Sequence, residues 1–190
     1  MIFLIHLFLF LFLFFLIITA LLFLIFILNS SIFGHDLPTS KRATIALAKI
    51  IQQYKPNAKI LYDLGCAHGN LSLRLKKILP QLNIYGIDNS AIRIFFAKLQ
   101  AKFLKRNVYF KKQDIFKIDL HNADVIYLYL WYDLMPLLEK KLQKELKQNA
   151  MVITNTSHFQ NWQPIKKIIT YPKISKMPDF ETLFVYIKNK

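Results

Sequence analysis

The chain has 190 residues, of which 54% are apolar, and its 26 Lys and Arg against 11 Asp and Glu give a formal net charge of +15. A single cysteine, Cys66, excludes an internal disulfide and agrees with a reducing compartment. The five histidines are scattered without the spacing of metal ligands, so no metal site is predicted.

Residues 1–28 contain no Lys, Arg, Asp or Glu, and only His6 and Thr19 interrupt the apolar side chains. As a helix this segment would reach about 40 Å, more than the roughly 30 Å hydrocarbon core of a bilayer. The basic n-region and small-residue cleavage site of a signal peptide are not clear here. All 26 basic residues follow the segment, so the positive-inside rule predicts one transmembrane helix with the C-terminal part in the cytoplasm.

The remaining residues are expected to form a short linker, 29–40, and one domain, 41–190. The domain begins with a predicted helix over 41–54, which Pro56 would end. Its inward side chains are expected to be the apolar ones at helical spacing: Ile45, Leu47, Ala48 and Ile51.

Residues 59–89 carry the strongest local signal. A strand over 60–64 stops at Gly65 and Gly69, and a short helix follows. The apolar face of that helix is expected to hold Leu71, Leu75, Ile78 and Leu79. A second strand over 83–87 ends at Asp88, which completes the strand, glycine turn, helix, strand and acid of a nucleotide-binding βαβ unit.

The turn, Asp63 to Gly69, distinguishes two classes of ligand. Dinucleotide sites use G-x-G-x-x-G and bring backbone close to a pyrophosphate, whereas an acid beside the turn would repel phosphates. The Asp63 carboxylate suits a ligand that carries an ammonium group, as S-adenosylmethionine does, and Asp88 suits ribose hydroxyls. The string resembles motif I and the acidic motif of class I methyltransferases, with Ala67 in place of the middle glycine. The alternative is an ordinary strand and turn of another α/β domain.

The alternation of strands and helices continues after residue 89. Ser90 is expected to cap a helix. Strands are predicted over 108–110, 124–130 and 150–155, with a helix carrying Leu134, Leu138, Leu142 and Leu146 before the last of them. The segments 168–174 and 182–188 are predicted to close the chain as an antiparallel pair. The helix after Ser90 is expected to face the sheet with its large apolar residues: Ile92, Phe95, Phe96, Leu99 and Phe103.

Six basic residues gather in a short stretch: Lys98, Lys102, Lys105, Arg106, Lys111 and Lys112. Such a surface attracts anionic lipid head groups or nucleic acid. We favour lipid because the predicted transmembrane helix would already hold the domain at a membrane. A Lys-rich composition throughout the chain is the other explanation for this charge.

Later segments narrow the resemblance. The chain is similar to the small membrane-anchored protein-lysine methyltransferases, which include the enzyme acting on the ATP synthase c subunit and archaeal and bacterial relatives. The similarity rests on motif I and on four further elements: Leu37-Pro38-Thr39, Tyr127-Leu128-Tyr129-Leu130, Lys141-Leu142-Gln143-Lys144-Glu145-Leu146, and Phe159, Trp162 and Pro164. Besides Ala67, the departures from the family pattern are His68 and Asn149.

This resemblance implies an α/β fold, a Rossmann-like class I methyltransferase sheet with helices on both faces, preceded by one transmembrane helix. It implies S-adenosylmethionine as cofactor and lysine of a protein at or in the membrane as methyl acceptor. Tyr129 is expected to line the acceptor channel, with Trp131, Phe159 and Trp162 as weaker candidates. The expected cofactor contacts are Thr39, Asp63, Gly65, Cys66, Gly69, Asp88, Asn89, Asp114 and Ile115, although Asp114 is also explained as a solvated loop residue.

Two alternatives stay open. A nucleic-acid or small-molecule methyltransferase would fit the basic charge, but nucleic-acid amino-methyltransferases normally carry D/N-P-P-Y/F after the fourth strand, which residues 127–131 lack. A catalytically weakened, membrane-bound binding or assembly factor would fit the loss of glycine at Ala67.

Overall fold

A computed structural model describes residues 2–33, 37–171 and 179–189. The chain divides into two compact units, one ending at Leu37 and one beginning at Pro38. In its described residues the first contains one helix, α1 (Ile2–Phe33), which continues past the expected end of the span at residue 28. Residues Ile2–Ile25 are long and apolar enough to cross a membrane, with a mean hydropathy of 3.2. Residues 34–36 of the expected linker lie outside the described residues.

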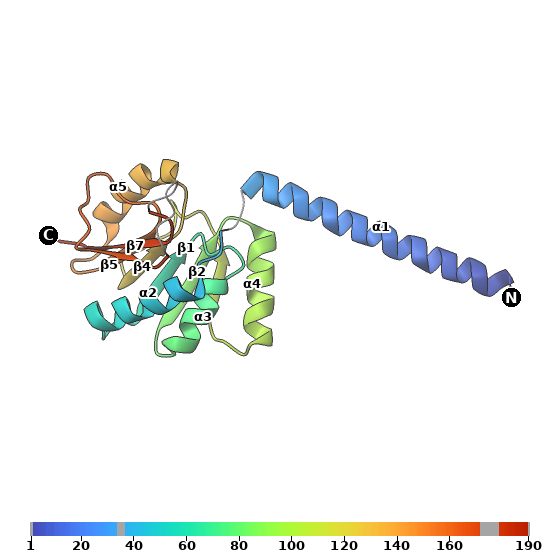
Figure 1. Cartoon of the computed structure of the whole chain (residues 1–190), viewed down its shortest axis with the longest axis horizontal. Coiled ribbons are helices and arrows are strands. Elements are labelled where there is room, and N and C mark those ends of the chain that lie inside the picture. Colours follow the sequence, from blue (N-terminus) through green and yellow to red (C-terminus); the bar gives the residue numbers. More distant parts are fainter. Residues whose placement is uncertain (1, 34–36, 172–178, 190) are drawn as a thin grey trace. The chain divides into compact units, whose positions relative to one another are not determined.

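The second unit is an α/β domain (Figure 1). Within the described residues seven strands form one sheet in the order β3-β2-β1-β4-β5-β7-β6. The first five are parallel where they pair, and β7 is antiparallel to both β5 and β6. The strands are β1 (Ile60–Leu64), β2 (Asn83–Asp88), β3 (Tyr109–Lys112), β4 (Val125–Leu128), β5 (Met151–Asn155), β6 (Lys166–Ile169) and β7 (Thr182–Ile187).

Four α-helices of the described domain and one 3-10 turn, Tyr132–Leu134, cover the sheet. They are α2 (Lys41–Tyr54), α3 (Asn70–Ile78), α4 (Ala91–Phe103) and α5 (Met135–Glu145). Apolar side chains of α2, α3 and α4 share one buried cluster with one face of the sheet, and those of α5 share another cluster with the opposite face. Alternate residues of β4 take part in each: Val125 and Tyr127 in the first, Ile126 and Leu128 in the second. The sheet therefore has helices on both faces, as expected.

The predicted elements are confirmed with small changes at their ends. The expected bounds of β1 and α2 are those observed, and β6 and β7 form the expected antiparallel pair, although residues 172–178 of the earlier segment lie outside the described residues. Ser40 caps α2 by accepting a hydrogen bond from the Ala43 N–H, and Ser90 caps α4 through the Arg93 N–H.

The expected orientation of α4 is wrong. All five of the large apolar residues assigned to the sheet are exposed, whereas Arg93, Ile94, Ala97 and Ala101 are buried against it. The small alanines let α4 approach the turn after β1 closely, since a β-carbon added at Gly69 would lie 3.1 Å from the Ala97 Cβ. Two inward assignments in neighbouring helices are wrong as well: Ile45 of α2 and Ile78 of α3 are exposed.

Candidate active site

Asp63 lies in β1, with Gly86 of β2 and Tyr127 of β4 opposite it on the two neighbouring strands. Its side chain is buried and accepts a hydrogen bond of 2.6 Å from the Ser72 hydroxyl of α3. Burial raises the pKa of Asp63 to about 7; the Ser72 hydrogen bond opposes this rise and the charge of Asp88 adds to it. A cation bound beside this buried carboxyl group would stabilise its ionised form.

The turn after β1 depends on left-handed backbone. Gly65 and Gly69 have φ of 80° and 76°. The N–H groups of Gly65 and Cys66 donate to the Ile87 carbonyl at 2.8 and 3.0 Å, which fixes the turn against the end of β2. A β-carbon at Gly69 would lie 2.4 Å from the Phe110 ring, so that position needs glycine for space as well as conformation.

Asp88 ends β2 and also holds the turn. One of its carboxylate oxygens accepts from the Ala67 N–H at 3.0 Å, and the other accepts from the Ser90 N–H at 2.9 Å. Each carboxylate oxygen can accept more than one hydrogen bond, so these contacts leave capacity for ribose hydroxyls. The structure thus brings the two acids, Asp63 and Asp88, to opposite sides of one turn, at the carboxyl end of the parallel strands.

Two departures from the family pattern share a backbone feature. Ala67 has φ of 47° and Asn149 has φ of 65°, and both stand where the pattern has glycine. Left-handed backbone costs a residue with a β-carbon roughly 1–2 kcal/mol, less for Asn, which tolerates it better. The turn therefore keeps its glycine-like geometry at Ala67 at some cost in stability.

The residues expected at the adenosine end are less enclosed. Asn89 and Asp114 are exposed, and Asp114 accepts from the Phe116 N–H at 2.9 Å. Ile115 packs against the α5-side cluster. Gln113, which sequence reasoning missed, donates its N–H to the Asp88 carbonyl and has a buried side-chain oxygen without a partner in the described residues.

A second polar group lies beside Asp63, at the strands β4 and β5. The Tyr127 hydroxyl is 2.8 Å from the Thr39 hydroxyl and accepts a hydrogen bond of 3.1 Å from the Asn155 amide. Burial raises the pKa of Tyr127, so it is a neutral phenol at physiological pH. Thr39, expected at the cofactor, is thereby connected to the strand next to Asp63.

Glu181, which precedes β7, is a further candidate that sequence reasoning missed. One of its carboxylate oxygens accepts from the Ser40 N–H at 2.8 Å, and the other is buried without a partner among the described residues. The side chain is 4% exposed. Its place beside Tyr129 depends on contacts between segments far apart in the chain. In the sequence it is recognisable only as an acid directly before a strand.

Tyr129 lies one residue past the end of β4 and is partly buried. Burial raises its pKa, a hydrogen bond with Thr156 opposes the rise, and the charge of Glu181 adds to it. Thr156 also accepts from the Glu181 N–H at 3.1 Å. Tyr129, Thr156 and Glu181 therefore form one group, which we name the acceptor group.

The weaker aromatic candidates are placed elsewhere. Phe159 and Trp162 stack on each other and pack with Tyr186 in the core on the α5 face, so they do not line an acceptor channel. Trp131 is 59% exposed. Their F-x-x-W spacing therefore serves core packing on this side of the sheet.

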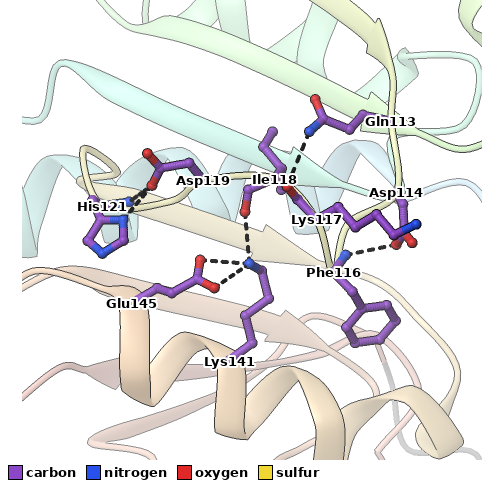
Figure 2. Close-up of polar contacts among 9 residues, drawn as sticks. All are labelled: Gln113, Asp114, Phe116, Lys117, Ile118, Asp119, His121, Lys141 and Glu145. Carbon is purple, nitrogen blue, oxygen red and sulfur yellow. Dashed lines mark hydrogen bonds and ion pairs between the residues drawn. The ribbon is translucent and has the colours of Figure 1, made fainter.

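A hollow of about 390 Å³ lies against α5 and contains none of the residues expected at the cofactor or acceptor. Figure 2 shows its polar contacts: the Lys141 ammonium donates to both oxygens of Glu145 at 2.6 Å and to the Ile118 carbonyl at 2.8 Å. His121 and Asp119 pair with each other at its rim. The charges of Lys141 and Glu145 in this hollow therefore compensate each other.

The residues around the turn fit S-adenosylmethionine. Asp63 is a buried acid that accepts its hydrogen bond from a neutral hydroxyl, which leaves its charge for the ammonium of a ligand. Asp88 keeps acceptor capacity at the end of the neighbouring strand, and the left-handed turn places backbone between the two acids. This arrangement, at the carboxyl ends of parallel strands, is where open α/β sheets bind ligands.

Fold and site together define a class I S-adenosylmethionine-dependent methyltransferase. Residues 63–166 match the model of the family described as ANTKMT methyltransferase domain, and the chain belongs to that family. The chain is a methyltransferase, and its cofactor is S-adenosylmethionine.

Two curated relatives are similar over most of the domain. A protein-lysine N-methyltransferase of Saccharolobus islandicus is 25% identical over 148 residues, which are 77% of this chain and 86% of the relative. An ATP synthase c-subunit lysine N-methyltransferase of Xenopus laevis is 23% identical over 130 residues, which are 67% of this chain and 57% of the relative.

A solved structure supports the fold. The RNA methyltransferase of Salinibacter ruber, in complex with S-adenosyl-L-homocysteine, superposes with a TM-score of 0.70 at 20% identity. The match covers 81% of this chain and 95% of that one. At this identity it establishes the class I methyltransferase fold and says nothing of the acceptor.

Proposed function

We propose that this enzyme is a membrane-anchored protein-lysine methyltransferase that modifies a protein at or in the membrane. The observation that carries the proposal is the acceptor group, in which a buried carboxylate oxygen of Glu181 without a partner in the described residues lies with Tyr129 beyond β4. The names of both curated relatives, lysine N-methyltransferases, support it.

At the donor end, we assign Asp63 to the ammonium of the cofactor and Asp88 to its ribose. Gly65, Cys66 and Gly69 shape the turn between them, and Asn89, Asp114 and Ile115 follow the neighbouring strands toward the adenosine end. When bound, S-adenosylmethionine supplies a methyl group on a cationic sulfur. The protein must then align an acceptor with that group, exclude water and present a neutral nucleophile.

The neutral nucleophile is the demanding requirement for lysine. Because the ordinary pKa of lysine is near 10.4, its deprotonation at pH 7.5 costs about 4 kcal/mol. Burial lowers this cost. The Glu181 oxygen that has no partner among the described residues is suited to accept the proton or to orient the amine, and the Tyr129 ring is suited to form the wall of a narrow channel.

The anchor we assign is α1. The two polar side chains of its apolar part, Ile2–Ile25, bond to the backbone of their own helix: Thr19 donates to the Leu16 carbonyl at 2.9 Å, and His6 Nδ1 lies 2.8 Å from the Ile2 carbonyl. Such internal satisfaction is what a helix needs in lipid. The charge asymmetry of the sequence favours a single pass with the catalytic domain, residues 41–190, on the cytoplasmic side.

The test is a comparison of lysine methylation in membrane proteins from cells with and without the gene, by mass spectrometry. Re-expression of the full chain should restore the missing methyl-lysine, and the Asp88→Ala form should not. Restoration of a methylated nucleotide instead would redirect the assignment to nucleic acid. Full methylation of the same lysines without the gene would overturn it.

A further inference from the structure

The outer surface of α4 is an apolar stripe, by which we mean Ile92, Phe95, Phe96, Leu99 and Phe103. These residues are 37%, 63%, 45%, 52% and 87% exposed. Their spacing places them on one side of the helix, opposite to the buried Ile94, Ala97 and Ala101. Single exposed apolar residues need no explanation, but a contiguous stripe with three phenylalanines marks an interaction surface.

The surroundings of the apolar stripe are basic. Residues 90–113 contain seven Lys and Arg and no Asp or Glu. Lys98 and Lys102 lie along one side of the stripe, and Lys105 is exposed just after the helix. Lys111 and Lys112 are exposed on β3, where Lys111 alternates with the buried Phe110 and therefore lies on the other face of the sheet. Among the described residues, no carboxylate lies within ion-pair distance of these five lysines.

We infer that the apolar stripe docks α4 into the head-group region of an anionic bilayer. A helix with phenylalanine and leucine on one side and lysine beside them is the form that interfacial membrane helices take. Aliphatic Ile92 and Leu99 in the stripe do not favour RNA, whose bases stack on aromatic rings. The inference rests on the proposed anchoring by α1.

The length of the connection supports this occupant. Seven residues, 34–40, join α1 to α2. A chain of that length reaches at most about 25 Å when fully extended. If α1 crosses the bilayer, the domain is held within reach of the lipid surface, and a basic, apolar helix face is then exposed at high local lipid concentration.

Docking through α4 would bring the cofactor turn to the membrane surface. The Phe96 ring lies 6.1 Å from that of His68, which belongs to the turn, and the Gln100 amide donates to the His68 carbonyl at 3.3 Å. Ser90, the N-cap of α4, donates its N–H to the Asp88 carboxylate at 2.9 Å. Docking therefore favours a substrate lysine that lies near the membrane surface.

The experiment uses the full chain in nanodiscs that contain brominated lipid, either neutral or with anionic phosphatidylglycerol. Phe103→Trp adds a tryptophan in the stripe, and Ile169→Trp adds one on β6, at the opposite edge of the sheet. The emission of the unsubstituted chain is subtracted, because Trp131 and Trp162 contribute to both.

We expect the tryptophan of Phe103→Trp to lose roughly half its emission in anionic discs, because an interfacial helix buries its apolar face about 5–10 Å deep. The Ile169→Trp signal should be unchanged. Adding Lys98→Glu with Lys102→Glu should lower the quenching to its value in neutral discs, with an unaltered circular dichroism spectrum.

Equal quenching at both positions would overturn the inference. A dimer in detergent that is lost in the double variant Phe95→Ser with Phe103→Ser would assign the stripe to a second copy. Shielding of the stripe by RNA and not by lipid would assign it to nucleic acid. Anchoring is measured separately, by whether the chain stays with vesicles in alkaline carbonate. Release of the chain from the vesicles in alkaline carbonate would contradict the anchoring by α1. The quenching result would still report on the docking of α4.

Discussion

The two ends of the candidate active site are built in different ways. The donor end comes from one continuous segment: Asp63, the turn through Gly69, and Asp88 at the end of the next strand, linked by hydrogen bonds of the turn to Ile87 and Asp88. The acceptor end comes from segments far apart in the chain, with Ser40, Tyr129, Thr156 and Glu181 meeting beyond β4 and β5.

This contrast explains why one end is general and the other particular. A cofactor that many enzymes share can be held by backbone and two acids in a fixed local pattern. An acceptor that differs among enzymes can be bound by side chains that come from segments far apart in the chain. Changes at the donor end should therefore affect cofactor affinity, and changes at the acceptor end should affect methyl transfer alone.

The largest effect is expected at Asp88. Asp88→Ala leaves the N–H groups of Ala67 and Ser90 without an acceptor and removes the proposed ribose contact. The unpaired donors lower stability, and a hydrogen bond to a charged acceptor contributes about 1.5–3 kcal/mol, so loss of the ribose contact should lower the affinity for S-adenosylmethionine roughly 100-fold. Calorimetry on the full chain in detergent measures this. Asp119→Ala, at an exposed acid, is the control, and equal affinity in both variants would remove Asp88 from the cofactor site.

Glu181→Gln tests the acceptor end. The amide keeps the shape and can still accept from the Ser40 N–H, but it cannot take a proton, so the rate of lysine methylation should fall roughly 100-fold. Cofactor affinity should not change.

The matched control is Glu139→Gln, since Glu139 is equally buried and accepts from the N–H groups of Gln160 and Asn161 on the α5 face. It should alter stability and leave methyl transfer unchanged. If both variants lose the same activity, or if Glu181→Gln also loses the cofactor, the separation of the two ends fails.

The donor end should respond to pH through Asp63. Its pKa of about 7 in the folded chain, against 3.8 ordinarily, means that the folded state keeps a proton that the unfolded state loses. Without ligand, this group's contribution to folding therefore becomes less favourable as the pH rises from about 4 to above 7. A cationic ligand binds the ionised form, so affinity should rise about tenfold from pH 6 to pH 8.

A pH series of calorimetric titrations measures this rise. Asp63→Asn, which cannot ionise, should bind more weakly and show no such slope between pH 6 and 8. A slope that persists in Asp63→Asn would have to come from another group, and Asp63 would then not be the ammonium partner.

The smallest effect is expected in the turn itself. Ala67→Gly relieves a left-handed residue and should raise the free energy of unfolding by about 0.5–1 kcal/mol. Gly69→Ala, in the same turn, should instead lower it, because its β-carbon would lie 2.4 Å from the Phe110 ring. Denaturant unfolding measures both, and changes of the same sign would contradict this account of the turn.

Helices α3 and α4 show where sequence patterns succeed and fail. In α3 the apolar positions Leu71 and Leu75 are buried as predicted, whereas Ile78, assigned to the same face at the exposed end of the helix, is not. Helix α4 has apolar residues on two sides, so periodicity alone allowed either to face the sheet. Close contact with the glycine turn selected the small side, with Ala97 and Ala101, and left the phenylalanines outside.

The sequence by itself determined the strand and helix order, the turn with its two acids, the family and the apolar N-terminal segment, because each depends on neighbouring residues and regular spacing. Only the tertiary structure decided that Phe159 and Trp162 pack in the core, that Glu181 joins Tyr129, and that α4 presents its phenylalanines outward. Those outcomes depend on which distant side chains fit together, since close packing selects by shape and size, and the spacing of residues along the chain carries no record of that fit.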